Sequence, residues 1–251
     1  TRSHLLVFDT GPAFNSGFST ASSVLAPYLQ RLGATRIDRL VLSHGDRDHA
    51  GGLGQLLGLV DVSEILSGES ERVGFGASPC HAGERWLWDG VAFEFLHPGQ
   101  PTALRGNNAS CVLRISNPAG SALLTGDIER TVEQELVVRH ADRLASRLVI
   151  APHHGSGSSS SRAFVAATQA DYVVFTAGWA NRYGFPAADV MQRWADIGAR
   201  ALDTSSAGTL GFRFLQDGRL TGPTRYRPDN RRYWRHDSSS AADVHAVSSG
   251  D

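Results

Sequence analysis

Two histidines and two aspartates lie within six consecutive residues in the first quarter of the chain. The segment reads His44-Gly45-Asp46-Arg47-Asp48-His49, and the glycine pair Gly51-Gly52 follows it closely. Imidazole and carboxylate groups bind divalent metal ions, and four of them at this spacing exceed what a helix cap requires. We therefore predict a metal site in which Asp48 and His49 serve one ion while His44 and Asp46 face another.

The elements around this segment place it at the end of a strand. Residues 37–42 form an apolar run that is typical of a buried strand, and residues 52–59 are expected to form a helix. The glycine pair is expected to let the chain turn sharply into that helix. Open α/β folds place their sites at the carboxyl ends of strands, which agrees with a functional role for the segment.

Two later strands also end in ligand-type residues. Asp127 follows the expected strand 122–125, and His153-His154 follow the expected strand 148–152. Asp127 alone would be as typical of a helix cap, but beside the first segment it is suited to bridge two ions roughly 3.5 to 4 Å apart. Of the two histidines, His154 is the better ligand candidate, and His153 is expected to support the site or act as an acid. Ordinary loop histidines are the alternative.

Strands alternate with helices along the chain, which predicts one large α/β domain. The chain has 251 residues, of which 41% are hydrophobic, and this is enough to bury a substantial core. We expect the domain to span residues 1–236 and residues 237–251, which are rich in Ser, Ala and Asp, to form a disordered tail. The remaining expected strands are 5–8, 63–66, 86–87, 91–96, 111–117, 171–176 and 208–215. The remaining expected helices are 22–32, a Glu- and Arg-rich segment after residue 127, 162–168 and 187–197.

The composition leaves the choice of partners open. The formal net charge is −1, so a polyanionic substrate would have to be attracted by a local patch. No apolar stretch is long enough to span a membrane, and no secretory signal is present. The start at Thr1, almost directly before an apolar strand, indicates a fragment of a longer protein. Cys80 and Cys111 could form a disulfide, but two buried free thiols are slightly favoured.

The order of these motifs resembles the metallo-β-lactamase superfamily, and within it the soluble β-lactamase-like domain of ComEC-type DNA-internalisation competence proteins. The resemblance covers residues 8–184, which is most of the chain. Its motifs are Phe8-Asp9-Thr10-Gly11, Leu42-Ser43-His44-Gly45-Asp46-Arg47-Asp48-His49-Ala50-Gly51-Gly52, Asn107-Asn108-Ala109-Ser110, Leu123-Leu124-Thr125-Gly126-Asp127-Ile128-Glu129, Pro152-His153-His154-Gly155-Ser156 and Asn181-Arg182-Tyr183-Gly184.

The resemblance implies an α/β fold in the form of an αβ/βα four-layer sandwich, with phosphodiester hydrolysis by a metal-activated water. Two divalent ions would be held by His44, Asp46, Asp48, His49, Asp127 and His154. Asp46 or Asp48 would also orient the water, and His153 would protonate the leaving oxygen. The candidates for substrate contact are Asn108, Ser110, Ser156, Asn181 and Arg182. A turn held by Asn181 and helix capping by the serines after residue 155 remain alternative interpretations.

Three departures from the commoner superfamily pattern affect the expected chemistry. Asp46 stands where most members have a histidine. A second histidine of the superfamily pattern is absent from the region of Asn107-Asn108-Ala109-Ser110. The resulting oxygen-rich ligand set favours Mn²⁺, with Zn²⁺ or Mg²⁺ also possible, and makes β-lactamase activity unexpected. Phe185 stands where many relatives have a histidine, so any catalytic contribution of that histidine is absent here.

The implied function is a metal-dependent nuclease that acts on DNA, preferably single-stranded, and degrades the strand not imported during natural transformation. The implied partners are DNA, the membrane-channel portion of the same full-length chain and other competence proteins. The domain would be monomeric in isolation and attached to the bacterial inner membrane on the periplasmic side, and its first strand would begin upstream of Leu5. Arginines and aromatic residues in 225–235 would suit DNA contacts, although covering a core edge is the commoner role. The alternative functions are a phosphodiesterase for another ester, such as phosphorylcholine, and a DNA-binding module with a decayed metal site.

Overall fold

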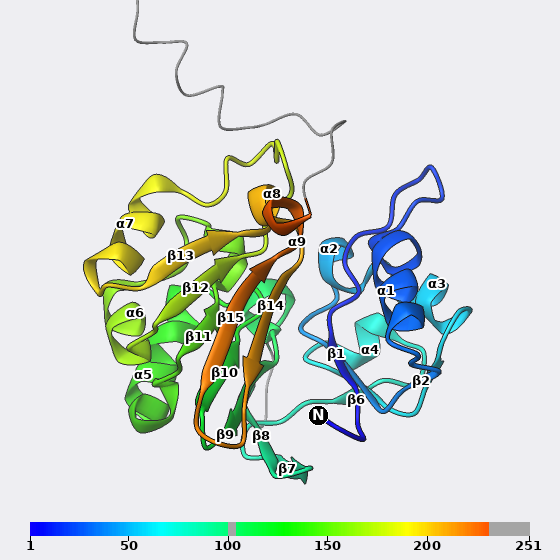
Figure 1. Ribbon diagram of the computed structural model, residues 1–251, viewed down its shortest axis with the longest axis horizontal. Coiled ribbons are helices and arrows are strands. Elements are labelled where there is room, and N and C mark those ends of the chain that lie inside the picture. The colour runs from blue at the N-terminus through cyan, green and yellow to red at the C-terminus, as the bar shows by residue number, and fades with distance from the viewer. Residues whose placement is uncertain (100–103, 231–251) are drawn as a thin grey trace, which may run out of the picture.

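Two β-sheets stand face to face in the computed structural model, which describes residues 1–99 and 104–230 (Figure 1). The larger sheet has the order β13 (Arg200–Asp203), β12 (Tyr172–Phe175), β11 (Leu148–Ile150), β10 (Gly120–Leu124), β9 (Val112–Asn117), β8 (Val91–His97) and β7 (Arg85–Trp88). The smaller sheet has the order β1 (Leu6–Phe8), β3 (Arg39–Leu42), β5 (Ile65–Ser67) and β6 (Ser78–Pro79). A hairpin of β14 (Leu210–Phe214) and β15 (Leu220–Arg225) lies in front of the larger sheet, shown in orange in Figure 1.

Helices cover the outer faces of both sheets, which gives the predicted four-layer sandwich. The larger sheet is covered by α5 (Arg130–Leu144), α6 (Arg162–Thr168) and α7 (Ala188–Asp196), at the left of Figure 1. The smaller sheet is covered by η1 (Ala21–Leu25), α1 (Ala26–Arg31) and α3 (Leu53–Leu57). Three apolar clusters fill the spaces between the four layers, and the middle one joins the two sheets through Val41, Leu66, Phe95 and Leu113.

Two details of the predicted strands differ in the structure. The expected strand 37–42 is divided at Asp38, because its carboxylate accepts a 2.8 Å hydrogen bond from the Leu5 amide. Residues before the break form β2 (Arg36–Ile37), which pairs with β4 (Asp61–Val62) instead of with the sheet. The sequence also did not predict the strands β4, β6, β13 and β15. It did not predict the short helices α2 (Arg47–Ala50), α4 (Ser70–Val73), α8 (Thr204–Ala207) and α9 (Tyr226–Asp229) either. The predicted tail 237–251 lies outside the described residues.

Cys80 and Cys111 form a disulfide, so the slightly favoured prediction of two free thiols is wrong. Both cysteines are fully buried between the two sheets, with their Cα atoms 6.2 Å apart. Thirty-one positions separate them in the chain, and only the facing of the sheets brings them together. The bond ties the segment after β6 to the residue directly following Ser110. By the loop-closure relation, a cross-link of this span stabilises a fold by roughly 3 to 4 kcal/mol.

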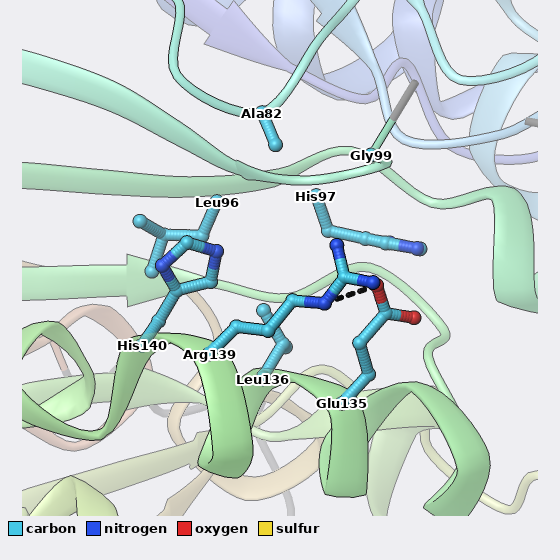
Figure 2. A pocket seen from close by; sticks show the side chains of 8 residues that line it. All are labelled: Ala82, Leu96, His97, Gly99, Glu135, Leu136, Arg139 and His140. Carbon is cyan, nitrogen blue, oxygen red and sulfur yellow. Dashed lines mark ion pairs between the residues drawn. The ribbon is translucent and has the colours of Figure 1, made fainter. Parts of the chain in front are cut away.

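His97, the last residue of β8, is buried under α5 (Figure 2). Neither of its ring nitrogens has a hydrogen-bond partner among the described residues. Its side chain lines a cavity of about 20 Å³ together with Glu135, Arg139 and His140 of α5. Burial, together with the positive charges of His140 and Arg139, lowers the pKa of His97 to about 4. The folded protein therefore favours the neutral form of the His97 imidazole.

This buried histidine predicts a loss of stability in acid. The pKa of His97 is near its ordinary value in the unfolded chain and lower in the folded chain, so its contribution is complete above about pH 6.5 and is lost as the pH falls toward 4. Between these limits we expect the free energy of unfolding to fall by about 3 kcal/mol more in the wild type than in a His97→Leu variant. Urea denaturation at pH 7, 5 and 4 measures this difference. Parallel pH profiles for the two proteins would contradict the assignment.

Candidate metal centre

The ends of four strands bring the candidate ligands to one edge of the sandwich. In the smaller sheet β1 and β3 run parallel and are followed by Asp9 and His44. In the larger sheet β10 and β11 run parallel and are followed by Asp127 and by His153-His154. Parallel neighbours end on the same side, so each sheet delivers its polar residues to one place.

Among the described residues, one group of side chains is arranged to hold a metal ion, namely Asp48, His49, Asp127 and His154. One ligand atom from each lies within 4.8 Å of the others. Nε2 of His49 is 3.1 Å from Oδ1 of Asp127. Nε2 of His154 is 3.5 Å from Oδ2 of Asp48 and 3.5 Å from Oδ2 of Asp127. Asp48 and His49 lie on the short helix α2 (Arg47–Ala50).

The imidazoles of the site share one orientation, with Nδ1 held by a neighbour and Nε2 directed to the centre. The Nδ1 contacts are His49 with Asp9 Oδ2 at 2.8 Å, His154 with Thr176 Oγ1 at 3.0 Å and His44 with Ser43 Oγ at 3.0 Å. Nε2 of His44 and of His49 is buried and makes no hydrogen bond to the described residues. Histidines that bind metals have this arrangement, because the anchored Nδ1 leaves the lone pair of Nε2 for the ion. The residues present therefore fit a divalent cation.

Charge coupling holds the centre together electrostatically. Burial favours the neutral form of His49, but the carboxylates of Asp9 and Asp127 outweigh it and raise the pKa of His49 to about 11. A hydrogen bond from His154 holds the pKa of Asp48 well below its usual range. Protons and metal ions thus compete for the same nitrogens, and metal affinity should rise with pH.

His44 and Asp46 lie beside the four-residue cluster and not inside it. The His44 and His49 rings are 4.3 Å apart between centroids, and Nε2 of His44 is 3.4 Å from Oδ2 of Asp46. Oδ1 of Asp46 is 2.7 Å from a guanidinium nitrogen of Arg72, a partner that the sequence did not indicate. The predicted pair His44 and Asp46 thus lies next to the predicted pair Asp48 and His49.

The backbone of the histidine pair has an unusual conformation. His153 and His154 have φ values of 48° and 55°, in the left-handed region, which residues other than glycine rarely adopt. The two side chains therefore point in different directions. His154 faces the cluster, whereas Nδ1 of His153 is 3.2 Å from Ser158 Oγ and 3.4 Å from Glu129 Oε1. Nε2 of His153 is 3.9 Å from Asp127, so His153 lies at the rim of the centre.

Glycines close to the ligands permit close packing. The chain turns at Gly51 and Gly52 between α2 and α3, as predicted, but their φ values of −61° and −82° are ones that any residue adopts, so the predicted need for backbone freedom is wrong. A Cβ at position 52 would lie 2.9 Å from the Thr10 carbonyl oxygen, and one at position 51 would lie 2.9 Å from the Ala13 amide nitrogen. The pair allows α2 to lie directly on the segment after β1, where Thr10 donates two hydrogen bonds to the His49 carbonyl.

Most of the predicted substrate-contact residues make hydrogen bonds within the protein. Ser110 is fully buried, and its Oγ accepts a hydrogen bond from the Asp127 amide at 3.0 Å, so it positions Asp127. Asn108 accepts a bond from the Glu129 amide, and Ser156, which is 8% exposed, bonds Ser158. Asn181 bonds both the amide and the carbonyl of Phe185, which is the alternative interpretation of a held turn. Arg182 remains exposed to solvent.

Several residues that build the site were missed in the sequence. Asp9 binds both Ser43 and His49; the sequence marked it by its place after an apolar strand and by the motif Phe8-Asp9-Thr10-Gly11, but it was not predicted to support the ligands. Thr176, after β12, and Arg72, on α4, lie far from the ligands in the chain and had no local signal. These supporting contacts arise from strand order in the sheets, which spacing along the sequence does not reveal.

Comparison with known proteins agrees with this fold. The family model of the metallo-β-lactamase superfamily matches residues 1–178. The chain is 38% identical to Competence protein ComA of Neisseria gonorrhoeae and 32% identical to Recombination protein 2 of Haemophilus influenzae, each over 84% of this chain. The matched parts are 30% and 26% of those proteins, so the chain spans less than a third of their length. The metallo-β-lactamase fold protein YhfI from Bacillus subtilis has a similar fold, with a TM-score of 0.50 over 81% of this chain and 85% of its own, at 13% identity.

The Asp9–His49 hydrogen bond predicts a test of the metal centre. An Asp9→Asn change removes the charge that orients His49, and we expect Mn²⁺ affinity to fall roughly 10- to 100-fold. Titration calorimetry with Mn²⁺ measures the loss. Asp89→Asn is the matched control, because Asp89 also has a left-handed backbone, with φ of 51° against 62° for Asp9, and asparagine tolerates that conformation. Equal affinities for Asp9→Asn and wild type would contradict this role.

Proposed function

Because this chain belongs to the metallo-β-lactamase superfamily, we propose that it is a metal-dependent hydrolase of the phosphodiester bonds of DNA. The observation that carries the proposal is the composition of its centre. Three carboxylates, Asp46, Asp48 and Asp127, face three imidazoles, His44, His49 and His154. Such an oxygen-rich set suits two hard divalent ions such as Mn²⁺, and paired ions of this type serve phosphoryl chemistry.

The side chains divide the work of the reaction. Divalent cations held by these ligands would polarise the phosphate and lower the pKa of the attacking water. Asp48 is the most exposed carboxylate of the cluster, and we assign to it the orientation of that water. His153 is held by Glu129 and Ser158 at the rim, and we assign to it the transfer of a proton to the leaving oxygen.

A row of rings leads from the centre to solvent and supports a substrate with exposed bases. The His153 and Phe185 rings are 5.8 Å apart between centroids, and the Tyr183 ring stacks on Phe185 at 5.6 Å. The Arg182 guanidinium lies 4.9 Å from the Tyr183 ring centroid. Tyr183 is 64% exposed, and Trp179 on the same loop is 77% exposed. Stacking surfaces beside a cation are typical of sites that bind single-stranded nucleic acid.

The similarity to competence proteins supports a place in DNA uptake. We propose that the chain is the catalytic part of a longer membrane-attached protein that degrades the non-imported strand, together with other competence proteins. The Cys80–Cys111 disulfide supports a position on the oxidising, periplasmic side of the inner membrane. In the part of the chain that the structure describes, no helix is both long and apolar enough to cross a bilayer.

Removal of one ligand charge tests the proposed reaction. We expect the wild type with Mn²⁺ to cleave single-stranded DNA, and an Asp48→Asn variant to lose at least about 100-fold of that rate, because the cation loses a charged ligand. Gel analysis of end-labelled oligonucleotides with Mn²⁺, Mg²⁺ or Zn²⁺ measures the cleavage. Asp142→Asn, on an 83% exposed side chain of α5, is the matched control and should keep full activity. Tight DNA retention without cleavage under any metal would instead support a binding module.

The row of rings predicts a preference for strands that carry bases. A Tyr183→Leu change should raise the KM for a single-stranded oligonucleotide about fivefold or more, because one stacking contact is lost. Steady-state kinetics should show no such change on an oligonucleotide built from abasic nucleotides. Tyr28→Leu, on α1, removes a ring that is 49% exposed and serves as the control. An equal rise in KM on both strands would show that Tyr183 does not contact bases.

A further inference from the structure

The Arg72 side chain lies across the segment of residues 44–49, and it comes from an element that supplies none of the candidate metal ligands. It belongs to α4, in the connection between β5 and β6. Its aliphatic stem runs over Gly45, since a Cβ at position 45 would lie 2.8 Å from Cδ of Arg72. A side chain at position 45 would therefore displace Arg72. The guanidinium extends beyond Gly45 and reaches Oδ1 of Asp46 at 2.7 Å.

Arg72 is itself held in place by an ion pair with Glu69. The Glu69 carboxylate accepts 2.9 Å hydrogen bonds from the amides of Gly45 and Gly106, and it also accepts one of 2.9 Å from Arg72. The Glu69 side chain is only 7% exposed, whereas that of Arg72 is 50% exposed. Burial tends to raise the pKa of Glu69, but the two amides and Arg72 outweigh it and lower the pKa. Glu69 is thus a fixed anion that aligns the guanidinium.

The two oxygens of Asp46 face different groups. Oδ1 faces Arg72, whereas Oδ2 lies 3.4 Å from Nε2 of His44, an atom that is buried and has no hydrogen-bond partner in the described residues. Arg72 therefore does not occupy the oxygen that faces His44. A carboxylate with one oxygen bound to a cation has its other oxygen fixed in direction, as seen for supporting contacts around metal ligands.

We propose that Arg72 is a positioning residue that fixes Asp46 as a ligand of the second metal position, opposite His44. The proposal rests on the proposed two-ion centre. It explains how a short carboxylate can stand where most superfamily members have an imidazole. Among the described residues Arg72 forms ion pairs with Asp46 and Glu69, and neither belongs to the four-residue cluster, so we expect the first position to depend little on Arg72.

Metal binding without DNA tests this role apart from nuclease activity. In an Arg72→Gln variant we expect the first equivalent of Mn²⁺ to bind as in wild type and the second to bind at least tenfold more weakly. Titration calorimetry gives both affinities, and the electron paramagnetic resonance signal of coupled Mn²⁺ pairs should be lost at the same metal concentration. Arg72→Lys, which keeps a cation near Oδ1, should recover part of the second affinity.

Two controls separate a positioning role from a general effect. Arg36→Gln breaks the ion pair between Arg36, on β2, and Asp38, which has the same length of 2.7 Å. This change should alter neither Mn²⁺ affinity. In an Asp46→Asn background, Arg72→Gln should add little further loss, because Arg72 acts through Asp46. An unchanged or tighter second equivalent in Arg72→Gln would overturn the proposal. A wild-type protein that binds only one equivalent would overturn it as well, and DNA cleavage by that protein would leave the proposed function standing.

Discussion

The buried carboxylate of Asp127 is the constraint on which the rest of the site depends. It is 4% exposed, and an ionised carboxylate at such a position needs compensating charge and hydrogen bonds. The imidazoles of His49 and His154 lie 3.1 Å and 3.5 Å from this carboxylate and come from opposite halves of the sandwich, and Ser110 accepts a hydrogen bond from the Asp127 amide. A divalent ion fits where these opposite charges already converge.

The parts of the site that the sequence predicted lie within short segments of the chain. His44 to His49 follow one apolar strand, and Asp127 and His154 follow two others, so period and spacing were enough to place them at strand ends. The four-layer fold followed from the resemblance of the motifs and is confirmed by the family match and the similar fold of a solved structure. A local sequence pattern is enough to predict candidate ligands where one strand and the loop after it contain all the residues concerned.

What the sequence missed depends on contacts between distant segments. Asp9 and His49 are 40 residues apart, and Arg72 reaches Asp46 only because β5 pairs beside β3. The disulfide requires the two sheets to face each other, and no pattern in either cysteine's neighbourhood shows that. The glycine pair was placed correctly but explained wrongly, because crowding by backbone atoms and not backbone freedom requires glycine there. Phe185 packs against His153, a contact that no motif indicated.

The proposed two-ion centre also bears on how a chain with a formal net charge of −1 could attract DNA. Four carboxylates gather at the centre, namely Asp9, Asp46, Asp48 and Asp127, and without bound cations they would repel a phosphate backbone. Two divalent ions would bring four positive charges and balance them. Arg182 on the row of rings adds a cation beside the centre. Under the proposed function, metal loading and DNA binding would therefore be coupled.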